Sequence, residues 1–396
     1  MVEPGRMEQR TSVLRRAFEA VGWLVLALAV FASPRITAQP IAFTVERASE
    51  WEALFDRTSG WTGSDGIYSI PLSSDESAGG YLETPTLFGF GDTFIGEVGP
   101  NGERLGGWSL VNNTLAYMPP GEPDPDTVDF YWSLDGFGNP AAAFVPDTPQ
   151  SSPGDWYWFG DWVIVGERLY NFPLRMVPGF LEIGGVSLLE LPLDSPQPLP
   201  NQRQADTPLY VPPQDGRDAL VFGGGILDNR REAGAPRPDG FLYVYGIENS
   251  LIKRLLVARV APEDLTDFTA WRYWDGGAWV SELTEAVAIT SGLSQEFSVS
   301  PLPDGRYVVV YKPWGSYVSL RIGDTPVGPF GDQIDIWLTP EDQFDPDVFT
   351  YNAKAHPHLS QPGELIISYN VNSLEFADNL EHADIYRPRF IRVRFE

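Results

Sequence analysis

Residues 63–96 read GSDGIYSIPLSSDESAGGYLETPTLFGFGDTFIG, and this stretch predicts two β-strands joined by a polar loop. The first strand, 65–72, alternates between two sets of side chains, and the second, 86–95, is aromatic and apolar. Serines, acids and glycines fill the loop 73–85 between them, which is a strong turn composition. The second strand is the first copy of an apolar pattern that recurs along the chain.

Each of the two strands carries one aspartate beside glycine, Asp65 in Gly-Ser-Asp-Gly and Asp92 in Gly-Phe-Gly-Asp-Thr. A carboxylate in an apolar strand is costly to bury unpaired, so it usually faces an opening or a partner. Glycines beside it let a large ligand approach the backbone. Two such acids could face one cleft as a general acid and a general base. The alternative is ordinary turn or strand-end chemistry.

Apolar strands of the same kind recur along the chain, roughly 60 to 80 residues apart. The copies are TLFGFGDTF (86–94), WVIVGERLYNF (162–172), DGFLYVYGI (239–247), DGRYVVVYK (304–312) and PGELIISYN (362–370). Companion strands follow them at 109–118, 186–191, 254–260, 317–323 and 389–395. Five repeats with this spacing predict an all-β, five-bladed β-propeller in a single domain over 39–396. A β-sandwich followed by a second β domain is the alternative.

Composition agrees with an all-β protein and excludes several kinds of chemistry. The 396 residues include 39 glycines, 36 prolines and 13% aromatic residues, a pattern of frequent turns between aromatic strands. Cysteine is absent, which excludes disulfides, thiolate nucleophiles and Cys-ligated zinc, and three histidines disfavour a His-rich metal site. We expect no cofactor. Calcium stays open, although the acidic loop at 345–347 lacks the full twelve-residue calcium pattern.

The charge points to a neutral partner. The formal net charge is −27, and such a chain repels nucleic acid and anionic membrane surfaces. A neutral polysaccharide or oligosaccharide fits this charge better than a polyanion does. Nothing in the sequence indicates an oligomeric state.

The N-terminus predicts a secretory signal peptide over residues 1–38. Four arginines between positions 6 and 16 form a basic region, the apolar run 21–32 follows, and a cleavage point comes after Ala38. A membrane anchor is the alternative, but the run is too short to span a bilayer comfortably. We therefore expect a secreted or periplasmic protein that is free of the membrane after signal removal.

Further polar and aromatic residues lie on or next to the expected inner strands. Tryptophan and asparagine with acids around one opening are the composition of a carbohydrate site, because aromatic faces stack on sugar C–H faces while amides and carboxylates bond hydroxyls. Core packing is the alternative for the tryptophan. The candidate substrate ligands are Asn112, Asn113, Trp158, Asp161, Asp228, Glu296, His356 and Asn370.

Several motifs in order resemble a known family. They are WTGSDGIYSIPL (61–72), FGFGDTFIG (88–96), WRYWDGGAW (271–279), GPFGDQ (328–333) and HPHLSQPGELIISYNVNS (356–373). These resemble five-bladed propellers first catalogued as domains of unknown function, a group that includes glycoside hydrolases acting as endo-D-arabinanases. The resemblance implies that Asp65 is the base and Asp92 the acid of an inverting hydrolysis. The loop 73–85 and the Trp-rich segment 156–162 depart from the family pattern, which leaves the sugar open.

Together these observations predict a secreted glycoside hydrolase that cleaves a neutral polysaccharide, with arabinan-like polymers as the first candidates. The alternative is a non-catalytic, lectin-like propeller. A lectin would need the stacking aromatics and the amides but not the paired acids.

Export has a direct test. Mass spectrometry of the native protein should show an N-terminus near Gln39, because the segment before it has the composition of a signal peptide. An intact Met1 on the native protein would contradict the prediction.

Overall fold

The computed structural model describes residues 42–179, 181–193, 202–343 and 345–396. The predicted signal peptide, 1–38, lies outside these residues. Residues 41–396 form one unit, and its secondary structure is dominated by strands, which confirms the all-β prediction. None of the helices in the described ranges has the length and apolar composition needed to cross a membrane.

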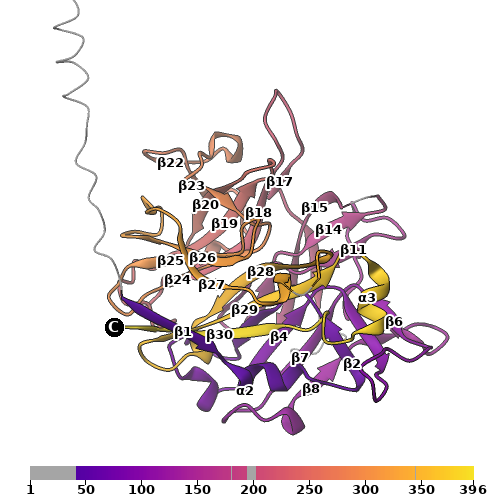
Figure 1. The fold of residues 1–396 in the computed structure, drawn as a ribbon. Helices are drawn as coiled ribbons and strands as arrows, with labels where there is room; N and C mark the ends of the chain where they lie inside the picture. The colour runs from indigo at the N-terminus through magenta and orange to yellow at the C-terminus, as the bar shows by residue number, and fades with distance from the viewer. Residues whose placement is uncertain (1–41, 180, 194–201, 344) are drawn as a thin grey trace, which may run out of the picture. The chain divides into compact units, whose positions relative to one another are not determined.

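The first and last strands of the unit pair in one sheet. The strands, in sheet order, are β1 (Phe43–Arg47), β30 (Arg389–Phe395), β29 (Glu364–Ser373) and β28 (Val348–His356). In Figure 1 β1, in indigo, lies beside β30, in yellow. Arg392 of β30 adds ion pairs, 2.9 Å to Glu364 of β29 and 3.4 Å to Glu46 of β1. The first and last strands of the unit therefore stabilise each other by pairing.

Residues 59–131 form two sheets, and the chain passes directly from a strand of one sheet to a strand of the other three times. The sheet β2-β5-β6 has β2 (Ser59–Ser64), β5 (Thr93–Glu97) and β6 (Ser109–Val111); the sheet β3-β4-β7-β8 has β3 (Tyr68–Pro71), β4 (Thr86–Phe90), β7 (Thr114–Met118) and β8 (Asp129–Tyr131). The chain passes from one sheet to the other at 65–67, 91–92 and 112–113. The strand predicted at 86–95 is therefore wrong in detail, because it is interrupted at 91–92, and the strand predicted at 65–72 begins only at Tyr68, after its aspartate.

A second group of strands has the same kind of interruption. Its sheet order is β11-β14-β15-β13-β12, with β16 on β15. The strands are β11 (Trp156–Trp158), β12 (Trp162–Val165), β13 (Arg168–Asn171), β14 (Leu174–Val177), β15 (Glu182–Pro192) and β16 (Arg203–Asp206). The break between β11 and β12 falls at 159–161, and that between β13 and β14 at 172–173.

The middle of the chain forms two further sheets and a short hairpin. One sheet holds β17 (Tyr210–Val211), β18 (Leu220–Asp228), β19 (Leu242–Glu248), β20 (Lys253–Val260), β21 (Arg272–Trp274), β22 (Trp279–Val280) and β23 (Thr290–Leu293). The other holds β24 (Phe297–Pro301), β25 (Tyr307–Tyr311), β26 (Tyr317–Gly323) and β27 (Ile334–Leu338), and the hairpin is β9 (Ser133–Leu134) with β10 (Pro140–Ala141).

Helices are short and lie in the connections. The α-helices are α2 (Ser49–Glu52) and α3 (Phe376–Glu381). The 3₁₀ turns are η2 (Ala53–Phe55), η3 (Gly80–Leu82), η4 (Pro125–Thr127), η5 (Pro262–Asp264), η6 (Leu283–Glu285), η7 (Glu341–Gln343) and η8 (Pro357–Leu359).

The repeated segments of the sequence lie on strands, as predicted. The copies at 239–247, 304–312 and 362–370 contain β19, β25 and β29, and their companions form β20, β26 and β30. Two of these copies start with an Asp-Gly pair whose aspartate forms a turn. Asp239 Oδ1 accepts the Phe241 N–H at 3.2 Å, and Asp304 Oδ1 accepts the Arg306 N–H at 2.9 Å.

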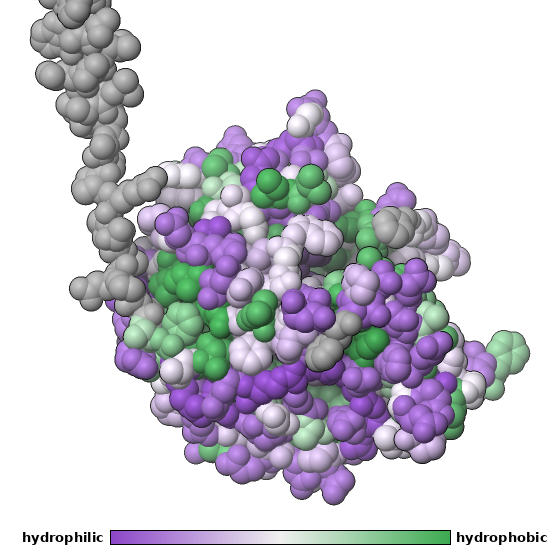
Figure 2. All heavy atoms as spheres, viewed as in Figure 1, coloured by the Kyte–Doolittle hydropathy of each residue, from purple (hydrophilic) through white to green (hydrophobic). Residues whose placement is uncertain are grey.

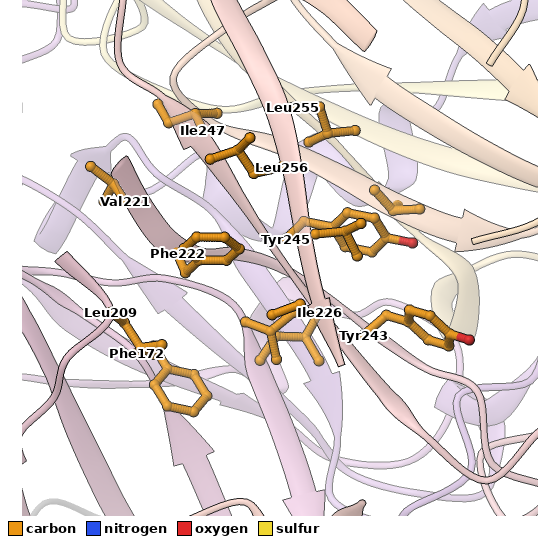
Figure 3. Packing of buried hydrophobic residues seen from close by; sticks show 14 of the residues in the cluster. Phe172, Leu209, Val221, Phe222, Ile226, Tyr243, Tyr245, Ile247, Leu255 and Leu256 are labelled. Atoms are coloured by element: carbon orange, nitrogen blue, oxygen red, sulfur yellow. The ribbon is translucent and has the colours of Figure 1, made fainter. Parts of the chain in front are cut away.

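The largest apolar cluster packs on β18, β19 and β20. In Figure 3 Phe222 and Leu256 of this cluster lie on one side of β19 and Tyr245 lies on the other, with Phe172 near Phe222. The glycines 223–225 form a bulge inside β18. Gly223 has φ +106, and a Cβ there would lie 2.6 Å from the Cβ of Phe172, so the bulge needs glycine.

One strand from each of five sheets contacts a strand of the next sheet. Contacts join β3 to β12, β12 to β18, β18 to β24, β24 to β28 and β28 to β3. The breaks at 65–67 and 159–161 lie at the ends of β3 and β12, and so they fall next to this set of strands.

Removing β1 tests how the ends hold each other. A chain that begins at Ala48 should melt several degrees below one that begins at residue 42, because β30 would lose its partner and Arg392 its bond to Glu46. In a chain of this size, each kcal/mol lost lowers the midpoint by about 2 °C. Calorimetry on both chains is the measurement, and equal midpoints would contradict the inferred role of β1.

Candidate active site

The interruptions between these strands face one cavity of about 380 Å³. Three carboxylates line it, and they come from different parts of the chain: Asp65, Asp92 and Glu296. The rest of the lining is largely aromatic and amide, and includes Tyr68, Trp158, Phe159, Phe349, Tyr351, Tyr386, Gln295, Asn352 and Asn372. The predicted pair Asp65 and Asp92 and the predicted ligands Trp158 and Glu296 thus lie around one opening.

Asp65 and Asp92 lie opposite each other immediately beyond the paired ends of β2 and β5. Their neighbours Ser64 and Thr93 pair in the β2–β5 ladder, and the Asp65 N–H donates to the Asp92 carbonyl at 3.3 Å. The Ser64 hydroxyl fixes this point further by donating to the carbonyls of Asp65 (3.0 Å) and Asp92 (2.9 Å). Directly opposite residues of an antiparallel pair project to the same face. The backbone thus brings both carboxyl groups to one side.

The Asp65 carboxylate is held by hydroxyl donors and by a close glycine. Tyr351 donates its hydroxyl to Asp65 Oδ2 at 2.7 Å, and Tyr386 also bonds the carboxylate. A Cβ at position 91 would lie 2.5 Å from Asp65 Oδ1, so only glycine leaves room. Burial, followed by the charges of Asp92 and Glu296, raises the Asp65 pKa from 3.8 to about 7, and the tyrosine bonds offset part of this rise.

Asp92 has a different set of donors, all on one oxygen. Trp158 Nε1 donates to Asp92 Oδ1 at 3.1 Å and Asn112 Nδ2 donates to the same atom at 3.3 Å. Burial raises the Asp92 pKa above its usual value, and these two bonds lower it in part. Because N–H groups can only donate, Oδ1 must accept, and a proton on this carboxyl group would sit on Oδ2.

Glu296 is held by a cation on the neighbouring sheet. It forms an ion pair with Lys354, whose side chain is 3% exposed, and Asn352 Nδ2 donates to Glu296 Oε1 at 2.9 Å. The Lys354 ammonium also lies 4.1 Å from the centre of the Tyr68 ring. Asn352 has φ 54 within a bulge of β28, a conformation that asparagine tolerates better than most residues.

Asn370 and His356 support the cavity from behind. Asn370 Oδ1 accepts the Gly66 N–H at 3.2 Å, and its amide also reaches the Ser64 carbonyl, so it fixes the segment around Asp65. His356 is buried between the hydroxyls of Ser69 (2.6 Å) and Ser368 (2.7 Å). Burial lowers the His356 pKa well below its usual value, so the ring is neutral and serves to join strands.

Of the eight candidate ligands, only Trp158 and Glu296 line this cavity. Asn112, His356 and Asn370 lie behind its lining, and the other three have different surroundings. Asn113 is buried, and its amide forms hydrogen bonds with the backbone of Phe144 and Tyr157. Asp161 and Asp228 line a second cavity of about 270 Å³, where Asp228 pairs with Arg230. These three therefore lack the position that a shared substrate site with Asp65 would require.

Asp161 has its own structural task. It accepts backbone N–H bonds from Trp162 at 2.9 Å and from Ile226 at 2.8 Å, which ties the break before β12 to the bulge of β18. Burial raises the Asp161 pKa to about 6, and these two bonds and Lys354 offset part of the rise.

Sequence reasoning did not find Tyr68, Tyr351, Tyr386 or Lys354. The tyrosines look like core residues in their strands, and Tyr386 follows α3 with no motif around it. Lys354 carried a usable signal, because it is one of only three lysines in the chain and lies two residues before His356.

Within the described ranges, no group of three or more His, Cys, Asp or Glu side chains has the geometry to hold a metal ion.

Figure 2 shows that the face in view is mostly hydrophilic, with hydrophobic residues gathered in separate patches.

The profile of one protein family, Domain of unknown function (DUF5005), matches residues 48–395. The chain belongs to this family. The match spans nearly all of the unit that carries the cavity. No curated protein matches the chain.

The solved structures that match this chain include proteins described as hydrolases. A candidate hydrolase from Bacteroides ovatus ATCC 8483 superposes with a TM-score of 0.68 at 22% identity, over 91% of this chain and 93% of that one. The catalytic domain of the Coprinopsis cinerea GH62 α-L-arabinofuranosidase gives 0.44 at 8% identity, over 85% and 97%. An α-L-arabinofuranosidase from Clostridium thermocellum ATCC 27405 gives 0.41 at 14%, over 72% and 78%. For this DUF5005 chain, the first of these similarities shows the fold alone.

The raised Asp65 pKa predicts a pH-dependent cost in stability. Between pH 4 and pH 7 the folded chain keeps a proton that the unfolded chain loses, so stability falls as pH rises through this window. The Asp65→Asn variant has no proton to lose at this position. The free energy of unfolding of the variant minus that of the parent should therefore be larger at pH 7 than at pH 4.

Urea unfolding of both chains at the two pH values measures this. The change should exceed about 1 kcal/mol, because one pKa unit corresponds to about 1.4 kcal/mol. Asp324→Asn, at an exposed position, is the matched control and should show no such change. A difference between Asp65→Asn and the parent that is the same at both pH values would contradict the assigned environment of Asp65.

Proposed function

We propose that this protein is a secreted glycoside hydrolase that cleaves a neutral polysaccharide with Asp65 and Asp92 as its acid and base pair. The observation that carries the proposal is that these two carboxylates lie opposite each other in one cavity, each with a raised pKa and its own donors. A lectin has no need of such a pair, because hydroxyl recognition is served by ionised or neutral groups at their usual pKa values.

The proposed architecture is a five-bladed β-propeller. Its support is the closed series of contacts from β3 through β12, β18, β24 and β28 back to β3. In this interpretation the bent sheets of residues 59–131 make one blade, and β1 completes the blade that ends the chain. The cavity then opens where the innermost strands meet, a common ligand position in propellers.

Asp92 is the proposed general acid. Its Oδ1 is engaged by Trp158 and Asn112, which leaves Oδ2 to carry the proton to the glycosidic oxygen of the leaving group. Burial keeps that proton in place at higher pH than an exposed carboxyl would. Asp65 is the proposed base that removes a proton from the attacking water, and a pKa near neutrality suits that role.

The two carboxylates have separate donors, the Tyr351 hydroxyl for Asp65 and the Trp158 indole for Asp92. The proposed stereochemistry is inversion, which requires a water between the base and the sugar. An inverting pair is typically about 6.5–9.5 Å apart, against about 5–5.5 Å for a retaining pair.

Glu296 has a supporting role in this proposal. It forms an ion pair with Lys354, and its charge raises the Asp65 pKa. A carboxylate held by an ammonium and an amide is a poor proton donor but a good acceptor of sugar hydroxyls. No cofactor takes part in the proposed reaction.

A panel of neutral plant and bacterial polysaccharides, assayed for release of reducing sugar, tests the activity. Asp65→Asn and Asp92→Asn should each lower kcat about 100- to 10,000-fold, since proton transfer by a positioned group is worth that much. Glu296→Gln should lower it less. All three variants should keep the parent's circular dichroism spectrum.

Substrates with a good leaving group separate the two roles. An activated aryl glycoside needs no proton from the acid, so Asp92→Asn should recover much of its rate on it, whereas Asp65→Asn should not. If Glu296→Gln shows that recovery instead, Glu296 is the acid. If the parent binds several glycans and cleaves none, the protein is a lectin.

A further inference from the structure

A third cavity, of about 660 Å³, adjoins the one that holds the acids. Both cavities are lined by Trp158, Leu174, Gln295, Phe349, Tyr351 and Asn352. Two cavities with so many walls in common form one continuous depression. A ligand bound against Asp92 can therefore extend into the larger cavity.

The larger cavity alternates flat aromatic faces with hydrogen-bonding groups. Trp158, Trp314 and Phe349 supply the faces, while Asn249, Gln295 and Asn352 supply amides. Sugars need both, because their C–H faces stack on rings and their hydroxyls bond amides. An acyl chain would use the apolar wall, which includes Leu251, but would form no hydrogen bonds with the amides.

Trp314 is the exposed member of this set. It is 93% exposed, and the loop that carries it is fastened at both ends. The Lys312 ammonium bonds the Gly315 carbonyl, and Thr339 donates to the Ser316 carbonyl at 2.8 Å from its N–H. A large aromatic ring held out on a fixed loop has little to gain in the free protein, but it can cover a ligand that lies across the cavity mouth.

The opposite wall is fixed in a similar way. Lys253 Nζ donates to Asn249 Oδ1 at 2.5 Å and to the Ser250 carbonyl at 3.2 Å, across the loop that presents Leu251, which is 89% exposed. Both walls are thus set before a ligand arrives, which reduces the ordering cost of binding.

We propose that this larger cavity holds further sugar residues of the polysaccharide, with Trp314 as a stacking platform that favours long chains over short ones. The inference rests on the proposed hydrolase function, because it extends the same substrate. It adds the site for the non-reacting part of the chain and the residue that selects for length.

The Trp314→Ala variant tests the proposal. The ratio of kcat/KM on a polymer to kcat/KM on a two-sugar substrate should fall roughly ten-fold, the size expected for one aromatic anchor. Phe137→Ala is the matched control, because Phe137 is also 93% exposed but lines none of the three cavities. That variant should leave the ratio unchanged.

Binding separates failure of this inference from failure of the proposed function. Affinity electrophoresis of Asp65→Asn in gels containing the polymer should show retardation, which the added Trp314→Ala change should reduce. If the parent hydrolyses the polymer but Trp314→Ala leaves both ratio and retardation unchanged, the inference is wrong. If Trp314→Ala weakens binding only of acylated or aryl glycosides, the cavity serves an apolar substituent and the inference is again overturned. Absence of any hydrolysis by the parent contradicts the proposed function instead.

Discussion

The backbone pairing of Asp65 with Asp92 is the constraint on which the rest of the site depends. These residues sit where paired strands leave one sheet and enter the next, with the Asp65 N–H bonded to the Asp92 carbonyl and the Gly91 N–H bonded to the Asp65 carbonyl at 2.8 Å. Because this point is fixed by main-chain bonds, the carboxylates need no long side chain to meet. Asn370 and Ser64 brace the same point from two sides.

Holding the acids there costs stability. Burial and mutual repulsion raise the pKa of Asp65 and disfavour its charged form, so the fold must offset that cost elsewhere. The offset comes from strand pairing and apolar packing, and from Lys354, whose ammonium is buried against Glu296 and the Tyr68 ring. In this account the same interactions that destabilise the ionised chain prepare the carboxylates to transfer protons near neutral pH.

The sequence predicted the strands far better than the surroundings of the acids. The repeats at 239–247 and 362–370 are regular apolar strands begun by Asp-Gly or Pro-Gly turns, and local chemistry decides them. Asp65 and Asp92 were recognisable because an acid among glycines conflicts with an apolar strand. The sequence could not show that Tyr386 lies at the cavity and that Asn113 is structural. The contacts that decide this join segments far apart in the chain.

The most direct measurement is a crystal structure of the Asp65→Asn variant with an oligosaccharide cut from the best polymer. The account predicts a sugar in the cavity, with its glycosidic oxygen within hydrogen-bond distance of Asp92 Oδ2 and a water between the sugar and residue 65. Further rings should continue past Trp158. An oligosaccharide bound in the cavity with its glycosidic oxygens away from both residues, or bound only elsewhere on the protein, would contradict the central claim.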